Sequence, residues 1–159
     1  MSLNSVQRFL ADLLDGLESP ELLPAQAWVL PPSMTQPGAQ PQIYVWGGTL
    51  TEARATLPRE KGQKRVSHTI SLYVQWMSPN DMAYEQHFPL LLDAIRATIR
   101  SVNLQQPITD ATTGEVSWLT DLGEKMTLSY STPVATNQQQ YLQNTAVLKL
   151  PVTEWVHPA

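Results

Sequence analysis

The chain has 159 residues, a hydrophobic content of 42% and a net charge of −4 at pH 7. This length suits one domain with a real core, and the composition is that of an ordinary globular protein. The absence of cysteine excludes disulfides and thiolate metal sites. No apolar run in the sequence is long enough to span a bilayer. The acidic net charge argues against nucleic-acid binding by the whole surface. Because Asp12 and Asp15 interrupt the apolar residues near the N-terminus, we expect no signal peptide and a protein that begins in the cytosol.

The first 48 residues predict one helix and two strands. Leucine and valine recur at steps of three and four over residues 3–17, which predicts an amphipathic helix docked on a sheet or on a neighbouring subunit. Six prolines between residues 18 and 42 exclude a long helix there. We expect a short strand within residues 25–30, an extended loop over 31–41, and a second strand over 43–46 that Gly47 and Gly48 close as a turn or bulge signal.

Residues 65–77 carry the clearest pattern in the chain, an alternation that makes one side of a strand nearly all apolar and the other mostly polar. Alternate side chains of a strand point to opposite faces, so this segment predicts the central strand of an antiparallel sheet. Tyr73 lies on the polar side, which suits a wetter face or an interface. His68 lies on the apolar side, where a partnered core or interface histidine is favoured over a metal ligand or a base. The apolar set is Val66, His68, Ile70, Leu72, Val74 and Trp76.

The rest of the chain predicts one long helix and further strands. Helical spacing runs from Tyr84 to Val102 and contains Pro89, so either a short first piece breaks there or the helix begins with proline in its first turn. We expect this helix to pack on the face of Ile70, Leu72 and Val74. Residues 107–110 predict a short extended piece. Residues 116–122 predict a strand, which a hairpin turn at 122–125 joins to another strand over 126–130. Residues 145–152 predict a closing strand, and Pro151 indicates that the end of this strand lies at a sheet edge. The prediction is an α+β fold in one domain over residues 1–159, a mainly antiparallel sheet packed by an N-terminal and a central helix.

A basic segment interrupts this acidic chain. Residues 54–65 hold five basic residues and one acidic residue, a net charge of +4, so the other residues together carry −8. The segment could be a solvated hairpin loop, or a projecting basic arm over about residues 49–65 that meets an acidic partner, a neighbouring subunit or DNA phosphate. The candidate interface residues are Arg54, Arg59, Lys61, Lys64, Arg65, Tyr73 and Trp46.

The search for catalytic motifs is negative. The three histidines, His68, His87 and His157, have no metal-binding spacing. Gly47 and Gly48 lack the surroundings of a phosphate-binding loop, and no nucleophile-elbow motif occurs. We therefore expect no enzyme, no cofactor, no metal and no catalytic residue. The five tryptophans are better explained by core and subunit contacts than by a ligand cage.

The order of elements resembles the tail terminator proteins of long-tailed bacteriophages and the related minor tail and neck completion proteins. The resemblance lies in residues 43–48, the basic arm, the strand with His68 and Trp76, and the helix over 84–100. It implies an α+β subunit of a hexameric ring that caps the tail tube, ends its polymerisation and joins it to the head–tail connector. The implied partners are further copies of the chain, the tail tube protein, connector proteins and DNA passing through the lumen, with no membrane. The implied location is the virion, after assembly in the host cytoplasm.

Two other classes remain open at this stage. One is a different virion part, such as a head completion or tube protein, which the position of the gene beside a tail-tube gene would discriminate. The other is a small-ligand-binding α+β protein or enzyme, for which ligand stabilisation in a thermal-shift screen is the test.

Overall fold

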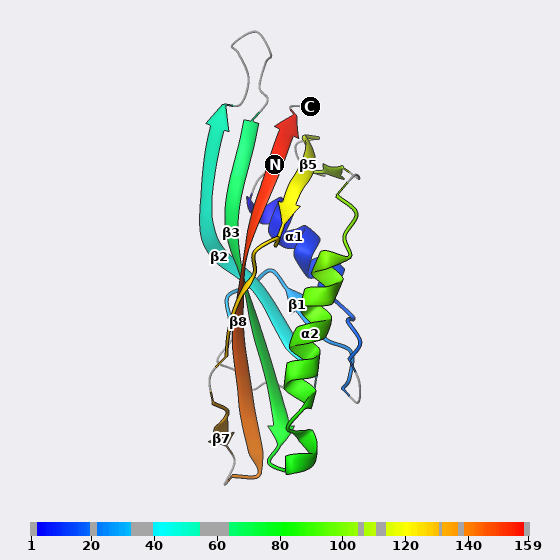
Figure 1. Ribbon diagram of the computed structural model, residues 1–159, viewed down its shortest axis with the longest axis vertical. Coiled ribbons are helices and arrows are strands. Elements are labelled where there is room, and N and C mark those ends of the chain that lie inside the picture. The colour runs from blue at the N-terminus through cyan, green and yellow to red at the C-terminus, as the bar shows by residue number, and fades with distance from the viewer. Residues whose placement is uncertain are drawn as a thin grey trace.

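Two helices lie on one side of a curled, mainly antiparallel sheet in the computed structural model (Figure 1). The structure describes residues 3–19, 22–32, 40–54, 64–104, 107–110, 114–130, 132–136 and 139–157. The fold is therefore α+β, with an N-terminal and a central helix, as predicted. The elements are α1 Leu3–Leu14, β1 Gln26–Trp28, β2 Gln42–Arg54, β3 Lys64–Pro79, the 3₁₀ helix η1 Met82–Tyr84, α2 His87–Arg100, β4 Ile108–Thr109, β5 Val116–Leu122, β6 Thr127–Tyr130, β7 Val134–Thr136 and β8 Tyr141–His157.

β3 is the central strand that the alternation predicted. It pairs with β2 on one side and with β8 on the other, where the antiparallel register runs from Lys64 opposite Val156 to Pro79 opposite Tyr141. The described strands follow the order β1-β2-β3-β8-β5-β4, and β6 and β7 also pair with β8. Every member of the predicted apolar set of β3 is buried. One face of β3 is therefore covered from Val66 to Trp76.

α2 covers this face as expected. Ile70, Leu72 and Val74 are fully buried and belong to one core cluster with the α2 side chains Leu91, Leu92, Ile95 and Ile99. α2 begins at His87, so Pro89 lies in its first turn. The missing N–H of a proline breaks no hydrogen bond at that position. Of the two alternatives for this region, the structure has the helix that starts with proline in its first turn.

Gly47 and Gly48 form a bulge and do not end the strand. The β2–β3 register shifts between Trp46 and Thr49, after which pairing resumes as far as Arg54 opposite Lys64. Gly48 has a φ of +113°, and a Cβ atom there would lie 1.6 Å from the carbonyl oxygen of Thr69, so the bulge requires glycine. The expected end of the strand at Trp46 is therefore wrong. Residues 49–54, expected to be part of a loop, are strand.

The expected hairpin after β5 is also wrong. β5 pairs with β8 between His157 and Val152, and β6 pairs with the next stretch of β8, from Lys149 to Ala146. β7 then pairs with Gln143 to Tyr141 of the same strand. These three short strands are successive pieces of one interrupted strand beside β8. The turn at Gly123, which has a φ of +67°, interrupts the strand without reversing the chain.

Pro151 lies inside β8 and not at its end, because β8 extends to His157. Its carbonyl oxygen accepts a hydrogen bond from the N–H of Gly123, 2.8 Å away. In an antiparallel strand the N–H and C=O of a residue point to the same side. The nitrogen of Pro151 therefore faces the interruption between β5 and β6, where no ladder hydrogen bond is lost. The proline indicates a gap in the neighbouring strand.

Candidate interaction surface

The basic end of the molecule is built by the last residues of β2 and the first of β3. Arg54 is paired with Lys64, and Arg65 is exposed and paired with Ala53. Residues 49–53 are all exposed, although successive side chains of a strand point to opposite faces. This half of β2 is thus uncovered on both faces. The predicted residues Arg59 and Lys61, with the rest of 55–63 and the side chains of Arg54 and Lys64, lie outside the described part of the chain.

The second group of predicted residues lies on the sheet face that the helices leave uncovered. Trp46 is 42% exposed and pairs with Ser71, and the half-buried Tyr73 pairs with Tyr44. Tyr44 also pairs with Trp28 of β1, which is 41% exposed. Neighbours in register share a face, so these side chains form a group that we call the aromatic face, namely Trp28, Tyr44, Trp46 and Tyr73.

The predicted interface residues therefore fall into two groups. Arg65 and Ser71, the partner of Trp46, are six residues apart on β3, or roughly 20 Å at the rise of a strand. Trp28 was not among the predicted interface residues, because a tryptophan in a three-residue strand carries no alternation to show which face it takes. Its indole Nε1–H donates to Oε1 of Gln42 at 2.8 Å, which holds the ring beside the first residue of β2.

A buried histidine–carboxylate pair, contributed by β3 and β8, lies on the opposite face of the sheet, which the helices cover. Nε2 of His68 is 3.4 Å from Oε1 of Glu154, and both side chains have 0% exposure. Among the residues that the structure describes, the nitrogens of His68 and the carboxylate oxygens of Glu154 have no hydrogen-bond partner. The interpretation of His68 as a partnered core histidine is confirmed. Glu154 was missed, because nothing in the sequence shows that its position on β8 faces His68.

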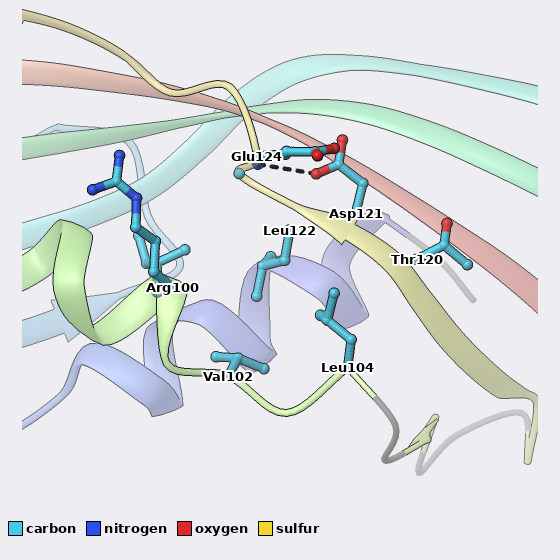
Figure 2. Close-up of a pocket in the computed structure, with 9 residues that line it drawn as sticks. Arg100, Val102, Leu104, Thr120, Asp121, Leu122 and Glu124 are labelled. Atoms are coloured by element: carbon cyan, nitrogen blue, oxygen red, sulfur yellow. Dashed lines mark hydrogen bonds between the residues drawn. The ribbon is translucent and has the colours of Figure 1, made fainter.

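A pocket of about 390 Å³ lies between the C-terminal end of α2 and the interruption between β5 and β6 (Figure 2). Its apolar lining comes from Ile99, Val102, Leu104 and Leu122, while Arg100 stands on one side and Asp121 and Glu124 on the other. Oδ1 of Asp121 accepts a hydrogen bond from the N–H of Glu124 at 3.0 Å, so this carboxylate stabilises the interrupting turn. An apolar floor with charges of both signs at the rim suits a side chain of a protein partner.

Within the described ranges, no group of three or more histidine, cysteine, aspartate or glutamate residues is arranged to hold a metal ion. No helix in the described part of the chain has the length and hydropathy needed to cross a membrane. Comparison of the chain with protein-family models and with curated proteins finds no match in either set.

Proposed function

We propose that the chain is a structural virion protein, a tail terminator. In this proposal, copies of the chain form a ring, a hexamer first, which caps the tail tube, ends its polymerisation and joins it to the head–tail connector. The protein is not an enzyme and acts through protein contacts in the neck or tail of the virion. The observation that carries the proposal is that the basic segment 54–65 joins the exposed ends of β2 and β3, while the other residues of the same chain together carry −8.

The hairpin end supports a contact between subunits. The basic segment 54–65 carries +4 and joins two strands at their exposed ends, and the other residues together carry −8. Opposite charges on different parts of one chain favour contacts between unlike surfaces of identical copies. Such heterologous contacts close into rings when the rotation between copies permits.

The aromatic face supports a second protein contact. Trp28 and Trp46 each expose about two fifths of their surface, and they lie on strands that no described helix covers on that side. Tryptophan and tyrosine are enriched at the centres of protein interfaces. A subunit that meets copies of itself, the tail tube and the connector needs more than one such surface.

Charge reversal of the basic segment tests the proposal. The variant Arg59→Glu/Lys61→Glu/Lys64→Glu should lose stacking on the tail tube. A matched control, Arg8→Glu/Lys125→Glu/Lys149→Glu, makes the same change of charge at three exposed positions elsewhere and should still cap tubes. Capping is measured by electron microscopy of tubes mixed with each variant. If the first variant caps tubes and supports infectivity as well as the control does, the segment is a solvated loop and this support for the proposal is lost.

DNA in the lumen is the second candidate contact for the basic segment, favoured by the same net charge of +4. In that case the reversed variant should still assemble and cap tails, and the defect should be confined to DNA retention or passage. The position of the gene relative to the tail-tube gene separates a terminator from another neck or tail component, such as a head completion protein.

A further inference from the structure

The end of the molecule opposite the basic segment carries an exposed apolar pocket that acidic residues help to line. The pocket has a volume of about 230 Å³ and lies where β3 passes into η1 beside the start of β8. Met82 is 85% exposed, and Tyr84 and Tyr141 each expose more than a third of their surface. We call this region the distal pocket, lined by Ser78, Pro79, Asn80, Asp81, Met82, Tyr84, Glu85, Pro133, Leu142 and Asn144.

Hydrogen bonds hold the shape of the distal pocket. Nδ2 of Asn144 donates to Oγ of Ser78 at 2.9 Å and to the carbonyl oxygen of Trp76 at 3.1 Å. Oδ1 of Asp81 accepts from the N–H of Ala83 at 3.0 Å and so caps η1. The first two bonds join β8 to β3, and the third caps η1, which follows β3 directly, so the exposed Met82 is presented on a supported backbone. Solvent-exposed apolar groups on such a frame mark an interaction site.

The charge of this end is acidic. Asp81 and Glu85 are exposed lining residues, and the sequence has no lysine or arginine between residues 66 and 95 or between 126 and 148. The basic segment 54–65 has the complementary composition, with Leu57 and Pro58 among its cations. An apolar pocket with acidic residues at its rim suits an apolar side chain flanked by basic residues.

The segment cannot reach the distal pocket of its own chain. Lys64 and Pro79 are the two ends of β3 and lie at opposite ends of the long axis of the molecule (Figure 1). Fifteen residue steps of a strand span roughly 50 Å. Residues 55–63 are anchored at both ends by the pair Arg54 and Lys64, so they extend at most about 17 Å beyond it. A contact between segment and pocket must therefore join two copies.

We propose that the distal pocket receives the basic segment of a second copy of the chain, with Leu57 in the pocket and the flanking cations beside Asp81 and Glu85. The contact is heterologous, because it joins one end of a subunit to the other end of the next. It rests on the self-association that the proposed function requires, and it names the two surfaces involved.

Disulfide trapping tests this contact without background, because the chain has no cysteine. The variants Leu57→Cys and Met82→Cys are mixed, and the rate of heterodimer formation is compared with that of Leu57→Cys mixed with Leu30→Cys. Leu30 is also exposed, at 51%. Docking raises the local thiol concentration, so the 57–82 pair should form about tenfold faster or more. Equal rates for the two pairs would overturn the inference.

Charge exchange supplies the second measurement. Adding Asp81→Lys and Glu85→Lys to the Met82→Cys chain should lower its rate of disulfide trapping with Leu57→Cys about tenfold, to the rate of the 57–30 pair. As a control, adding Asp12→Lys and Glu18→Lys, which are exposed positions elsewhere, should leave this rate unchanged. Combining the reversed pocket with the reversed segment Arg59→Glu/Lys61→Glu/Lys64→Glu on the opposite chain should restore trapping. A loss that this exchange fails to restore would contradict the proposed charge pairing.

The two proposals fail separately. If light scattering shows a ring while the 57–82 pair forms no faster than the 57–30 pair, the ring uses another surface and only this inference fails. If the 57–82 pair forms specifically but the protein neither caps nor shortens tail tubes, the contact stands and the proposed function fails.

Discussion

His68 and Glu154 face each other across neighbouring strands, with Nε2 and Oε1 3.4 Å apart and both side chains fully shielded from solvent. His68 lies opposite Val152 in the register, and Glu154 lies opposite Val66 two residues further along, so the pair is diagonal on the covered face. Removing one partner of a buried polar pair leaves the other desolvated and without a partner.

The free energy of unfolding should show this dependence. We expect His68→Leu or Glu154→Leu alone to lower it by about 1–3 kcal/mol, the cost of leaving a buried polar group without its partner. The double variant should lose less than the sum of the two, because it leaves neither polar group buried without its partner. Urea unfolding of the four proteins gives the coupling energy directly. Additive effects would mean that the two side chains do not interact.

Leu72 should contribute strongly to stability through its position at the centre of β3. Its side chain is fully buried, so Leu72→Ala should lower the free energy of unfolding by about 2–5 kcal/mol. The matched change Leu50→Ala on the exposed half of β2, where the side chain is 38% exposed, should cost less than about 1 kcal/mol. Thermal unfolding compares the two variants. An unchanged melting temperature for Leu72→Ala would mean that β3 does not contribute to the hydrophobic core.

The bulge in β2 predicts a difference between two adjacent glycines. Gly47 has a φ of +73° with open space around a hypothetical Cβ, so Gly47→Ala should cost about 1–2 kcal/mol from backbone strain alone. Gly48→Ala should cost clearly more, because its Cβ would collide with the Thr69 carbonyl and force the two strands apart. Chemical denaturation of both variants checks this order, and equal losses would argue against the observed register.

Trp46 and Trp76 allow assembly to be separated from folding. Trp76 is 3% exposed, so Trp76→Ala should destabilise the folded chain by about 3–5 kcal/mol. Trp46 is 42% exposed on the aromatic face, and we expect Trp46→Ala to leave the melting temperature nearly unchanged while weakening association with tail tubes. Thermal unfolding and co-sedimentation with tubes measure the two effects. Undiminished sedimentation of the Trp46→Ala variant would exclude the aromatic face from the contact.

The sequence predicted those elements whose signal is contained in their own residues. The alternation from Val66 to Trp76 and the apolar stripe from Leu91 to Ile99 are imposed by burial on one face, so both were read correctly. The bulge alternative at Gly48 was correct, but the strand end placed there, the hairpin at Gly123 and the sheet edge at Pro151 were wrong for one common reason. At each of these residues the backbone either has a positive φ or lacks an N–H donor. The residue alone does not show whether the chain reverses there, forms a bulge or faces a gap in the sheet, because that depends on the neighbouring strand.

The candidate surfaces depended still more on the three-dimensional arrangement. The basic segment could be identified from charge alone, because it holds five of the ten basic residues of the chain within twelve positions. The distal pocket was not predicted, since Asp81 and Leu142 become neighbours only when β3 and β8 pair along their full length. The same holds for Trp28, whose place on the aromatic face follows from its pairing with Tyr44.

The central claim is that this chain forms a ring that ends the growth of a tail tube. The most direct measurement is the length of tubes that a tail-tube protein assembles with and without the purified chain, followed by electron microscopy. We predict shorter tubes in its presence, each closed at one end by a ring of this protein. Tubes of unchanged length with bare ends, and a chain that remains monomeric in their presence, would contradict the account.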